Sequence, residues 1–189
     1  FKGLKMRIPG FAGEVLSKLG VVVTNIPPGE LYTALDRGTI DALEWVGPSL
    51  DLNMGFQKIA PYYYTGWHEP ATELQFMVNQ AKFDALPMHL QKILTIAMQF
   101  AASDMYARSY HESAVNWASI EKEYPNVTIR TFSPEIIAAM KKANDELLQA
   151  TAAKDATFKE IWESQKAYMK KARKWTAISD YAYLKDNLE

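Results

Sequence analysis

Short apolar segments of two kinds alternate along the first 46 residues of the chain. Three segments have strand character, because their apolar residues alternate or form a β-branched run too short for a helix: residues 4–8, 21–24 and 40–46. The second of these is typical of a buried strand. Two others have helical spacing and end at a glycine: residues 14–19 and 30–37. This rhythm predicts βαβ units and a mainly parallel sheet, and therefore an α/β fold.

The remainder of the chain changes from loop-rich to mainly helical. We expect a short helix around residues 50–57, then an aromatic loop, and a strand where residues 73–79 alternate. Apolar residues recur at helical spacing from Pro87 to about Glu123. The later pattern predicts a strand at residues 127–132 and helices at 134–150 and 157–174.

Composition limits the class of protein without indicating a function. The 189 residues carry 21 basic and 22 acidic side chains, which gives no electrostatic reason to expect nucleic acid as a partner. Because there is no cysteine, disulfides, thiolate nucleophiles and cysteine-ligated metals are excluded. No segment has the apolar length of a transmembrane helix.

Two segments that combine a carboxylate with a tryptophan make residues 38–70 the candidate site region. Residues 44–48 (EWVGP) and 66–70 (GWHEP) each end in a proline that interrupts regular structure. Between them lies the tyrosine run 62–64, and tyrosine is frequent at ligand surfaces. An indole that excludes water beside a carboxylate suits a small-molecule site. The alternative is an aromatic core with glutamates at its solvated rim.

Arg7, Glu44 and Glu69 are the charged residues best placed for chemistry. Arg7 lies near the end of a predicted strand and could bind a carboxylate through two parallel hydrogen bonds. Glu44 and Glu69 could be the paired acids of a hydrolase or oxygen ligands for a cation, and the residues alone leave both open. His68 adjoins Glu69 and could contact the same site. The sequence contains no G-x-S-x-G, no H-E-x-x-H and no glycine-rich phosphate loop.

Three motifs together resemble those of a known family. They are residues 5–10 (KMRIPG), residues 29–42 (GELYTALDRGTIDA) and the EWVGP segment 44–48. They are similar to the substrate-binding proteins of tripartite ATP-independent periplasmic (TRAP) transporters, of the DctP type. The tyrosine run and the Gly-Trp-x-Glu pattern at residues 66–69 resemble the branch that binds 2-oxo acids or lactate with a metal ion.

This resemblance implies a periplasmic-binding-protein-like fold, in which two α/β lobes joined by long crossing segments close on a ligand. The chain resembles the later part of that fold, so a signal peptide and most of the first lobe are expected outside it. Residues 1–70 are then expected to form an α/β ligand-binding lobe. Residues 71–133 would contribute a crossing strand, a long helix and a return strand, and residues 134–189 the C-terminal helices.

The resemblance also implies a function and a set of site residues. The function is that of a non-enzymatic periplasmic receptor that binds a small monocarboxylate, such as pyruvate or lactate, with Na⁺ or Ca²⁺ and delivers it to the TRAP membrane subunits. By match to the family motifs, Arg7 pairs with the ligand carboxylate, while Glu44, the Trp45 carbonyl and Glu69 coordinate the cation. The side chains expected to contact the ligand besides Arg7 are Trp45, Tyr64, Trp67 and His68.

Relatives of this branch can dimerise by exchanging a C-terminal helix, and the aromatic tail, residues 175–189, suits the same role. Two other functions stay open from the residues alone. One is a metal-assisted or paired-carboxylate hydrolase that uses Glu44 and Glu69. The other is a helical interaction module with an α/β cap.

Overall fold

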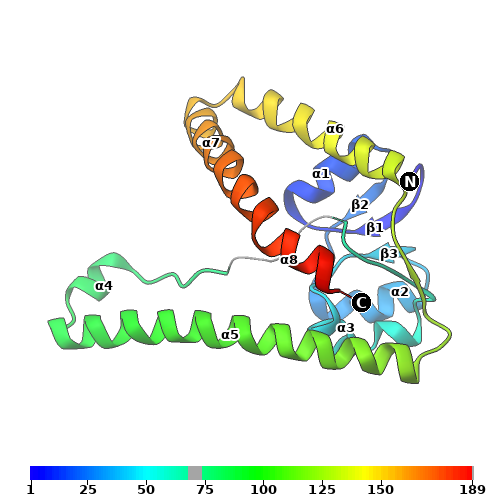
Figure 1. Ribbon diagram of the computed structural model, residues 1–189, viewed down its shortest axis with the longest axis horizontal. Helices are drawn as coiled ribbons and strands as arrows, with labels where there is room; N and C mark the ends of the chain where they lie inside the picture. Colours follow the sequence, from blue (N-terminus) through cyan, green and yellow to red (C-terminus); the bar gives the residue numbers. More distant parts are fainter. Residues whose placement is uncertain (68–73, 189) are drawn as a thin grey trace. The chain divides into compact units, whose positions relative to one another are not determined.

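A three-stranded parallel sheet with the order β2-β1-β3 forms the first part of the fold (Figure 1). Strand β1 pairs with β2 on one side and with β3 on the other, and both pairings are parallel. This arrangement confirms the predicted βαβ organisation. The elements are β1 (Lys5–Arg7), α1 (Gly10–Lys18), β2 (Val22–Thr24), the 3₁₀ turn η1 (Pro28–Glu30), α2 (Leu31–Asp36) and β3 (Ala42–Leu43).

Apolar residues of these elements and of the connections between them form a small core around the sheet. The most completely buried among them are Ile8, Leu16, Leu31 and Ile40, each at most 2% exposed. Gly13 allows α1 to lie close to the sheet, because an added Cβ atom would come within 2.8 Å of the Ile8 carbonyl oxygen. Burial of this apolar surface is the main source of stability for such a unit.

The strands are shorter and more exposed than the sequence predicts. Val22 is 51% exposed, because β2 is an edge strand and not the buried strand that its β-branched run suggests. The predicted strand at residues 40–46 has only residues 42 and 43 in the sheet. After β3 the chain turns at Gly47, whose φ of 141° lies in a region that favours glycine, and enters a helix at Pro48.

A second parallel pair joins segments far apart in the sequence. Helix α3 (Pro48–Met54) and the turn η2 (Phe56–Lys58) lead to β4 (Tyr62–Tyr64), which pairs with β5 (Thr128–Arg130). The tyrosine run is therefore a strand, and the expectation of an aromatic loop is wrong. Local pattern could not reveal this, because the partner strand comes after the whole of the long helix α5 (Met88–Glu123).

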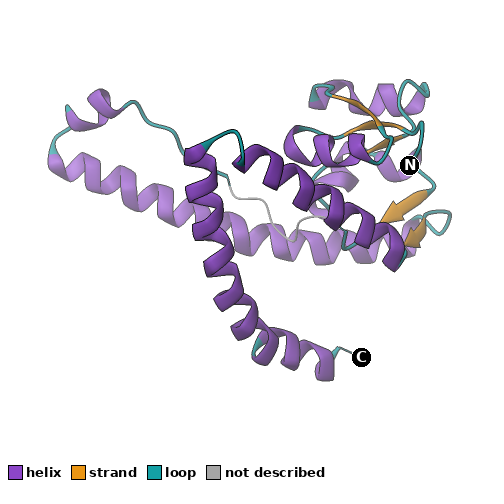
Figure 2. Ribbon diagram, turned by 90° about the horizontal axis from the view of Figure 1, so that it is seen from above, coloured by secondary structure: helices purple, strands orange, loops and turns teal. Residues whose placement is uncertain are grey.

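Apart from β5 and short connections, the described chain from residue 80 onward is helical (Figure 2). Helices α5, α6 and α7 confirm the predicted helices, and α8 agrees with the expected helical chain end, whereas α4 was not predicted. The expected strand at residues 73–79 is wrong for the described residues 74–79, which form no regular structure and leave Leu74, Phe76 and Met77 exposed. The remaining helices are α4 (Gln80–Asp84), α6 (Pro134–Ala152), α7 (Ala156–Ile178) and α8 (Asp180–Asn187).

The computed structural model describes residues 1–67 and 74–188. The chain divides into two compact units, residues 1–137 and residues 138–189. Within the described residues, no helix is both long enough and apolar enough to cross a membrane. The functional division into a ligand-binding lobe, a crossing segment and a C-terminal tail stays a prediction.

Candidate functional site

Sheet geometry brings Arg7 and Glu44 together, although 36 residues separate them in the sequence. Arg7 is the last residue of the central strand β1, and Glu44 follows directly after the neighbouring strand β3. Because the two strands are parallel, their carboxyl ends lie side by side, and the Glu44 amide donates a hydrogen bond of 3.0 Å to the Arg7 carbonyl oxygen. Ligands of open α/β sheets bind at this edge.

The Arg7 guanidinium is buried between Glu44 and Trp45. Its Nη1 donates a hydrogen bond of 2.8 Å to the Glu44 carbonyl oxygen and lies 3.6 Å from the carboxylate oxygen Oε2. The side chains of Arg7 and Glu44 are only 8% and 11% exposed. The guanidinium carbon lies 5.4 Å from the centre of the Trp45 ring, within cation–π range.

One donor of Arg7 is left over in this arrangement. Its buried Nε has no hydrogen-bond partner among the described residues, and neither has the buried indole Nε1 of Trp45. Buried polar groups are nearly always satisfied in native proteins. An arginine with a spare buried donor, held against a tryptophan, has the chemistry of a site that accepts a carboxylate.

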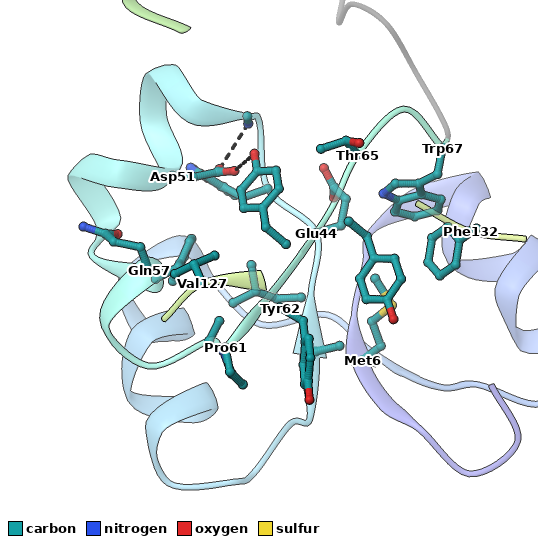
Figure 3. Close-up of a pocket in the computed structure, with 18 of the residues that line it drawn as sticks. Met6, Glu44, Asp51, Gln57, Pro61, Tyr62, Thr65, Trp67, Val127 and Phe132 are labelled. Atoms are coloured by element: carbon teal, nitrogen blue, oxygen red, sulfur yellow. Dashed lines mark hydrogen bonds between the residues drawn. The ribbon is translucent and has the colours of Figure 1, made fainter. Parts of the chain in front are cut away.

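An open cleft of about 1040 Å³ lies in the same unit (Figure 3). Four of the predicted site residues line it, namely Glu44, Trp45, Tyr64 and Trp67. Arg7 is not among the lining residues and lies behind Glu44 and Trp45, which do line the cleft. The predicted residues His68 and Glu69 lie outside the described residues.

Phe132 is a component of the cleft that the sequence analysis missed. Its ring stacks on Tyr64 with centres 4.5 Å apart. It forms edge-to-face pairs with Trp67 and Phe1, whose ring centres lie 5.7 Å and 5.6 Å from its own. Figure 3 shows Trp67 and Phe132 together on one side of the cleft. Phe132 follows β5 by two residues, so only the pairing of β4 with β5 brings it to this wall.

Asp51 and Tyr63 form a second feature that the sequence pattern did not single out. The Tyr63 hydroxyl donates a 2.7 Å hydrogen bond to one carboxylate oxygen of Asp51, and the Gly47 amide donates a 3.1 Å bond to the other. Burial raises the pKa of the Tyr63 phenol well above its usual value, and the charge of Asp51 raises it further. The phenol is therefore a fixed donor at any physiological pH.

The donor set beside the cleft has the chemistry of a site for a hard cation. Glu44 supplies a nearly buried carboxylate, and the Trp45 carbonyl accepts no hydrogen bond within the described residues. Both are oxygen ligands of the kind that Ca²⁺ and Na⁺ prefer. Within residues 1–67 and 74–188, however, no three His, Cys, Asp or Glu side chains gather closely enough to hold a metal ion. A third protein ligand from residue 69 therefore stays a prediction.

Comparison with known proteins places the chain in a family. The profile of the bacterial extracellular solute-binding proteins of family 7, the DctP family, matches residues 1–155. The chain belongs to this family. It is 40% identical over 184 residues to a monocarboxylate 2-oxoacid-binding periplasmic protein of Nostoc sp. (strain PCC 7120), with 96% of this chain and 50% of the relative covered.

Two solved TRAP periplasmic solute-binding proteins share the fold at 65% identity. The protein from Colwellia psychrerythraea, with bound calcium and pyruvate, matches 98% of this DctP-family chain at a TM-score of 0.95. The protein from Pseudoalteromonas atlantica, with bound sodium and pyruvate, matches 97% at a TM-score of 0.93. In both cases 56% of the solved chain is covered, so this chain spans about half the length of the proteins it matches. The expected periplasmic-binding-protein fold and TRAP family are confirmed.

Proposed function

We propose that this DctP-family protein is the solute receptor of a TRAP transporter, and that it binds a small 2-oxo monocarboxylate such as pyruvate together with a cation. The observation that carries the proposal is the buried Arg7–Glu44–Trp45 group at the carboxyl ends of β1 and β3. Support comes from relatives at 65% identity that hold pyruvate with calcium or with sodium.

A 2-oxo acid matches the chemistry of these residues. It offers one carboxylate and one adjacent oxo oxygen, and an arginine can bind the carboxylate through paired hydrogen bonds. A cation bound by Glu44 and the Trp45 carbonyl would supply positive charge for the oxygens of the acid. Trp45, Tyr64 and Trp67 would exclude water and limit the length of the ligand, because their rings line the cleft. We propose that His68 also contacts the ligand and that Glu69 is a further ligand of the cation.

We further propose that the receptor works in the periplasm and delivers its ligand to TRAP membrane subunits without catalysis. The Nostoc relative is named as a periplasmic binding protein, and the matched family consists of extracellular solute-binding proteins. The hydrolase alternative required Glu44 and Glu69 as paired acids. Relatives at 40% and 65% identity are solute-binding proteins, and this favours a binding role for Glu44 over a catalytic one.

Release of the natural ligand provides the direct test. The intact protein, with any sequence that flanks these residues, is purified without added organic acids and denatured, and the released small molecules are identified by mass. We expect a 2-oxo monocarboxylate at close to one equivalent, and tryptophan fluorescence should then report its rebinding to the refolded protein in the presence of Ca²⁺ or Na⁺. Chemical conversion of the acid during incubation, or fluorescence that does not change with any 2-oxo acid, would contradict the proposal.

We also propose that the protein forms a two-fold dimer through its C-terminal helices. Large apolar side chains of α7 and α8 remain exposed within the described chain, and burying them would stabilise an assembly by about 25 cal/mol per Å². The most exposed members of this set are Tyr168, Trp175, Ile178, Tyr181 and Tyr183, all above 60%. A helix exchanged between two subunits is one way to cover them.

Light scattering measures the mass of the protein in solution and therefore tests whether it forms a dimer. At micromolar concentration we expect the mass of a dimer for the intact protein and of a monomer after removal of residues 175–189. A matched variant that replaces the exposed α5 residues Tyr106 and Tyr110, which lie outside the tail, should leave the mass unchanged. An intact protein with the mass of a monomer, whose tail resists protease, would show that the helix packs on its own chain.

A further inference from the structure

Two walls of the cleft are tied together by one carboxylate. Asp51 lies on α3, directly after the segment that carries Glu44 and Trp45, while Tyr63 lies on β4, directly before Tyr64 and Trp67. The 2.7 Å bond from the Tyr63 hydroxyl to Asp51 therefore joins the segment of the proposed cation ligands to the strand of the aromatic wall. Figure 3 shows both hydrogen bonds of Asp51 at the edge of the cleft.

The second bond of Asp51 acts on the backbone of the binding segment. The Gly47 amide donates it at 3.1 Å, and this amide lies two residues after Trp45. Gly47 has a φ of 141°, a conformation that glycine adopts readily but that leaves the backbone many alternatives, so a hydrogen bond at this point selects one of them. By accepting this bond, Asp51 constrains the turn that sets the direction of the Trp45 carbonyl.

Helix α5 supports both members of the pair. Trp117 packs edge-on against the Tyr63 ring with centres 5.7 Å apart. Its neighbour Asn116 donates hydrogen bonds of 2.9 Å and 3.3 Å to the carbonyl oxygens of Pro48 and Ser49, at the start of α3. The carboxylate and the phenol are thus held from one rigid element, which suits groups that must keep a fixed separation.

We infer that Asp51 and Tyr63 are positioning residues, an inference that rests on the proposed function. They hold the Glu44–Trp45 segment in the geometry required to bind a cation and, through the cation, the 2-oxo acid. Asp51 is not itself assigned as a cation ligand, because both of its oxygens already accept hydrogen bonds from the protein. Partners that orient metal ligands in this way commonly change metal affinity 10- to 100-fold when they are removed.

Calcium titrations of Tyr63→Phe, Asp51→Asn and the double variant of the intact protein provide the test, in sodium-free buffer. Calorimetry first measures calcium binding in the absence of pyruvate. Pyruvate binding is then measured at increasing calcium concentrations. Each single variant should raise the calcium concentration for half-maximal pyruvate binding by about 10- to 100-fold. The double variant should bind calcium no more weakly than the weaker of the two single variants, because both substitutions disrupt the same hydrogen bond between Tyr63 and Asp51.

Matched controls separate positioning from general destabilisation. Tyr106→Phe and Asp36→Asn change exposed residues that do not line the cleft, and should leave the calcium requirement unchanged. Hydrogen exchange of the Gly47 amide should be faster in Asp51→Asn than in wild type, with exchange of the buried strand β1 unaltered. A variant that melts earlier but keeps the wild-type calcium requirement would overturn the positioning role.

Three further outcomes are decisive. If Asp51→Asn abolishes calcium binding while Tyr63→Phe matches wild type, Asp51 is a direct ligand and the positioning role is wrong. If the wild-type protein takes up neither calcium nor pyruvate, the proposed function fails and the positioning role fails with it. If wild type binds both and all three variants match it, the proposed function stands and only the inference about Asp51 and Tyr63 falls.

Discussion

Replacement of Arg7 by alanine is expected to weaken binding of the 2-oxo acid by about 30- to 5000-fold, which corresponds to roughly 2–5 kcal/mol for loss of a buried charged partner. The guanidinium is buried, and its Nε has no hydrogen-bond partner among the described residues. Its removal would therefore cost a desolvated interaction that water cannot replace. Arg7→Lys should also bind at least about tenfold more weakly, because an ammonium group cannot present two parallel donors.

Calorimetry with pyruvate at saturating calcium measures this effect on the intact protein. Arg7 also contacts Glu44, so its removal affects stability, and Arg7→Lys, which keeps the positive charge, is the informative variant. Arg37→Ala serves as the matched control, because Arg37 is exposed and does not line the cleft. Affinity of Arg7→Ala within twofold of wild type would show that Arg7 does not bind the ligand.

Removal of the cation is expected to lower affinity for the acid strongly, and Glu44→Gln should reproduce much of that loss. Glutamine keeps an oxygen in place but removes the negative charge that balances the cation, so affinity for the cation should fall by about 10- to 100-fold or more. The effect should appear as a higher calcium or sodium requirement for pyruvate binding. At saturating cation the affinity for pyruvate should partly recover.

The experiment compares metal-stripped protein with protein titrated with Ca²⁺ or with Na⁺, and follows pyruvate binding. Glu14→Gln is a suitable control, since Glu14 is exposed on α1 and does not line the cleft. Both ions deserve titration because the two solved relatives contain different ones. Unchanged pyruvate affinity in metal-stripped protein would remove the cation from the proposal while leaving the receptor function in place.

Local residue pattern was sufficient for most of the helices and for the parallel βαβ organisation of the first sheet. Glycines 20 and 38 ended predicted helices where the structure ends them within two residues, and Pro134 begins the predicted helix α6. These features depend on neighbours in the sequence, since capping and helix periodicity act over a few residues. The residue pattern singled out Arg7, Glu44 and Trp45, the family resemblance implied their roles, and the structure brings these three side chains together.

Pairings between distant segments could not be predicted in this way. The tyrosine run became a strand because β5 supplies a parallel partner, and the same pairing brings Phe132 to the wall of the cleft. Residues 74–79 alternate like a strand, yet no partner strand pairs with them in the described chain. A strand needs hydrogen bonds from another segment, so alternation alone does not determine where one forms.

The amino-acid pattern therefore determined the α/β class and the positions of most helices, and it supplied the residue types of the proposed site for a small carboxylate. Tertiary structure decided which of these residues meet. Arg7 reaches Glu44 because parallel neighbouring strands end at the same edge, and Asp51 reaches Tyr63 because α5 holds α3 and β4 against each other. The physical reason is that chemistry resides in individual side chains, whereas proximity between them comes from long-range pairing and packing that no local segment encodes.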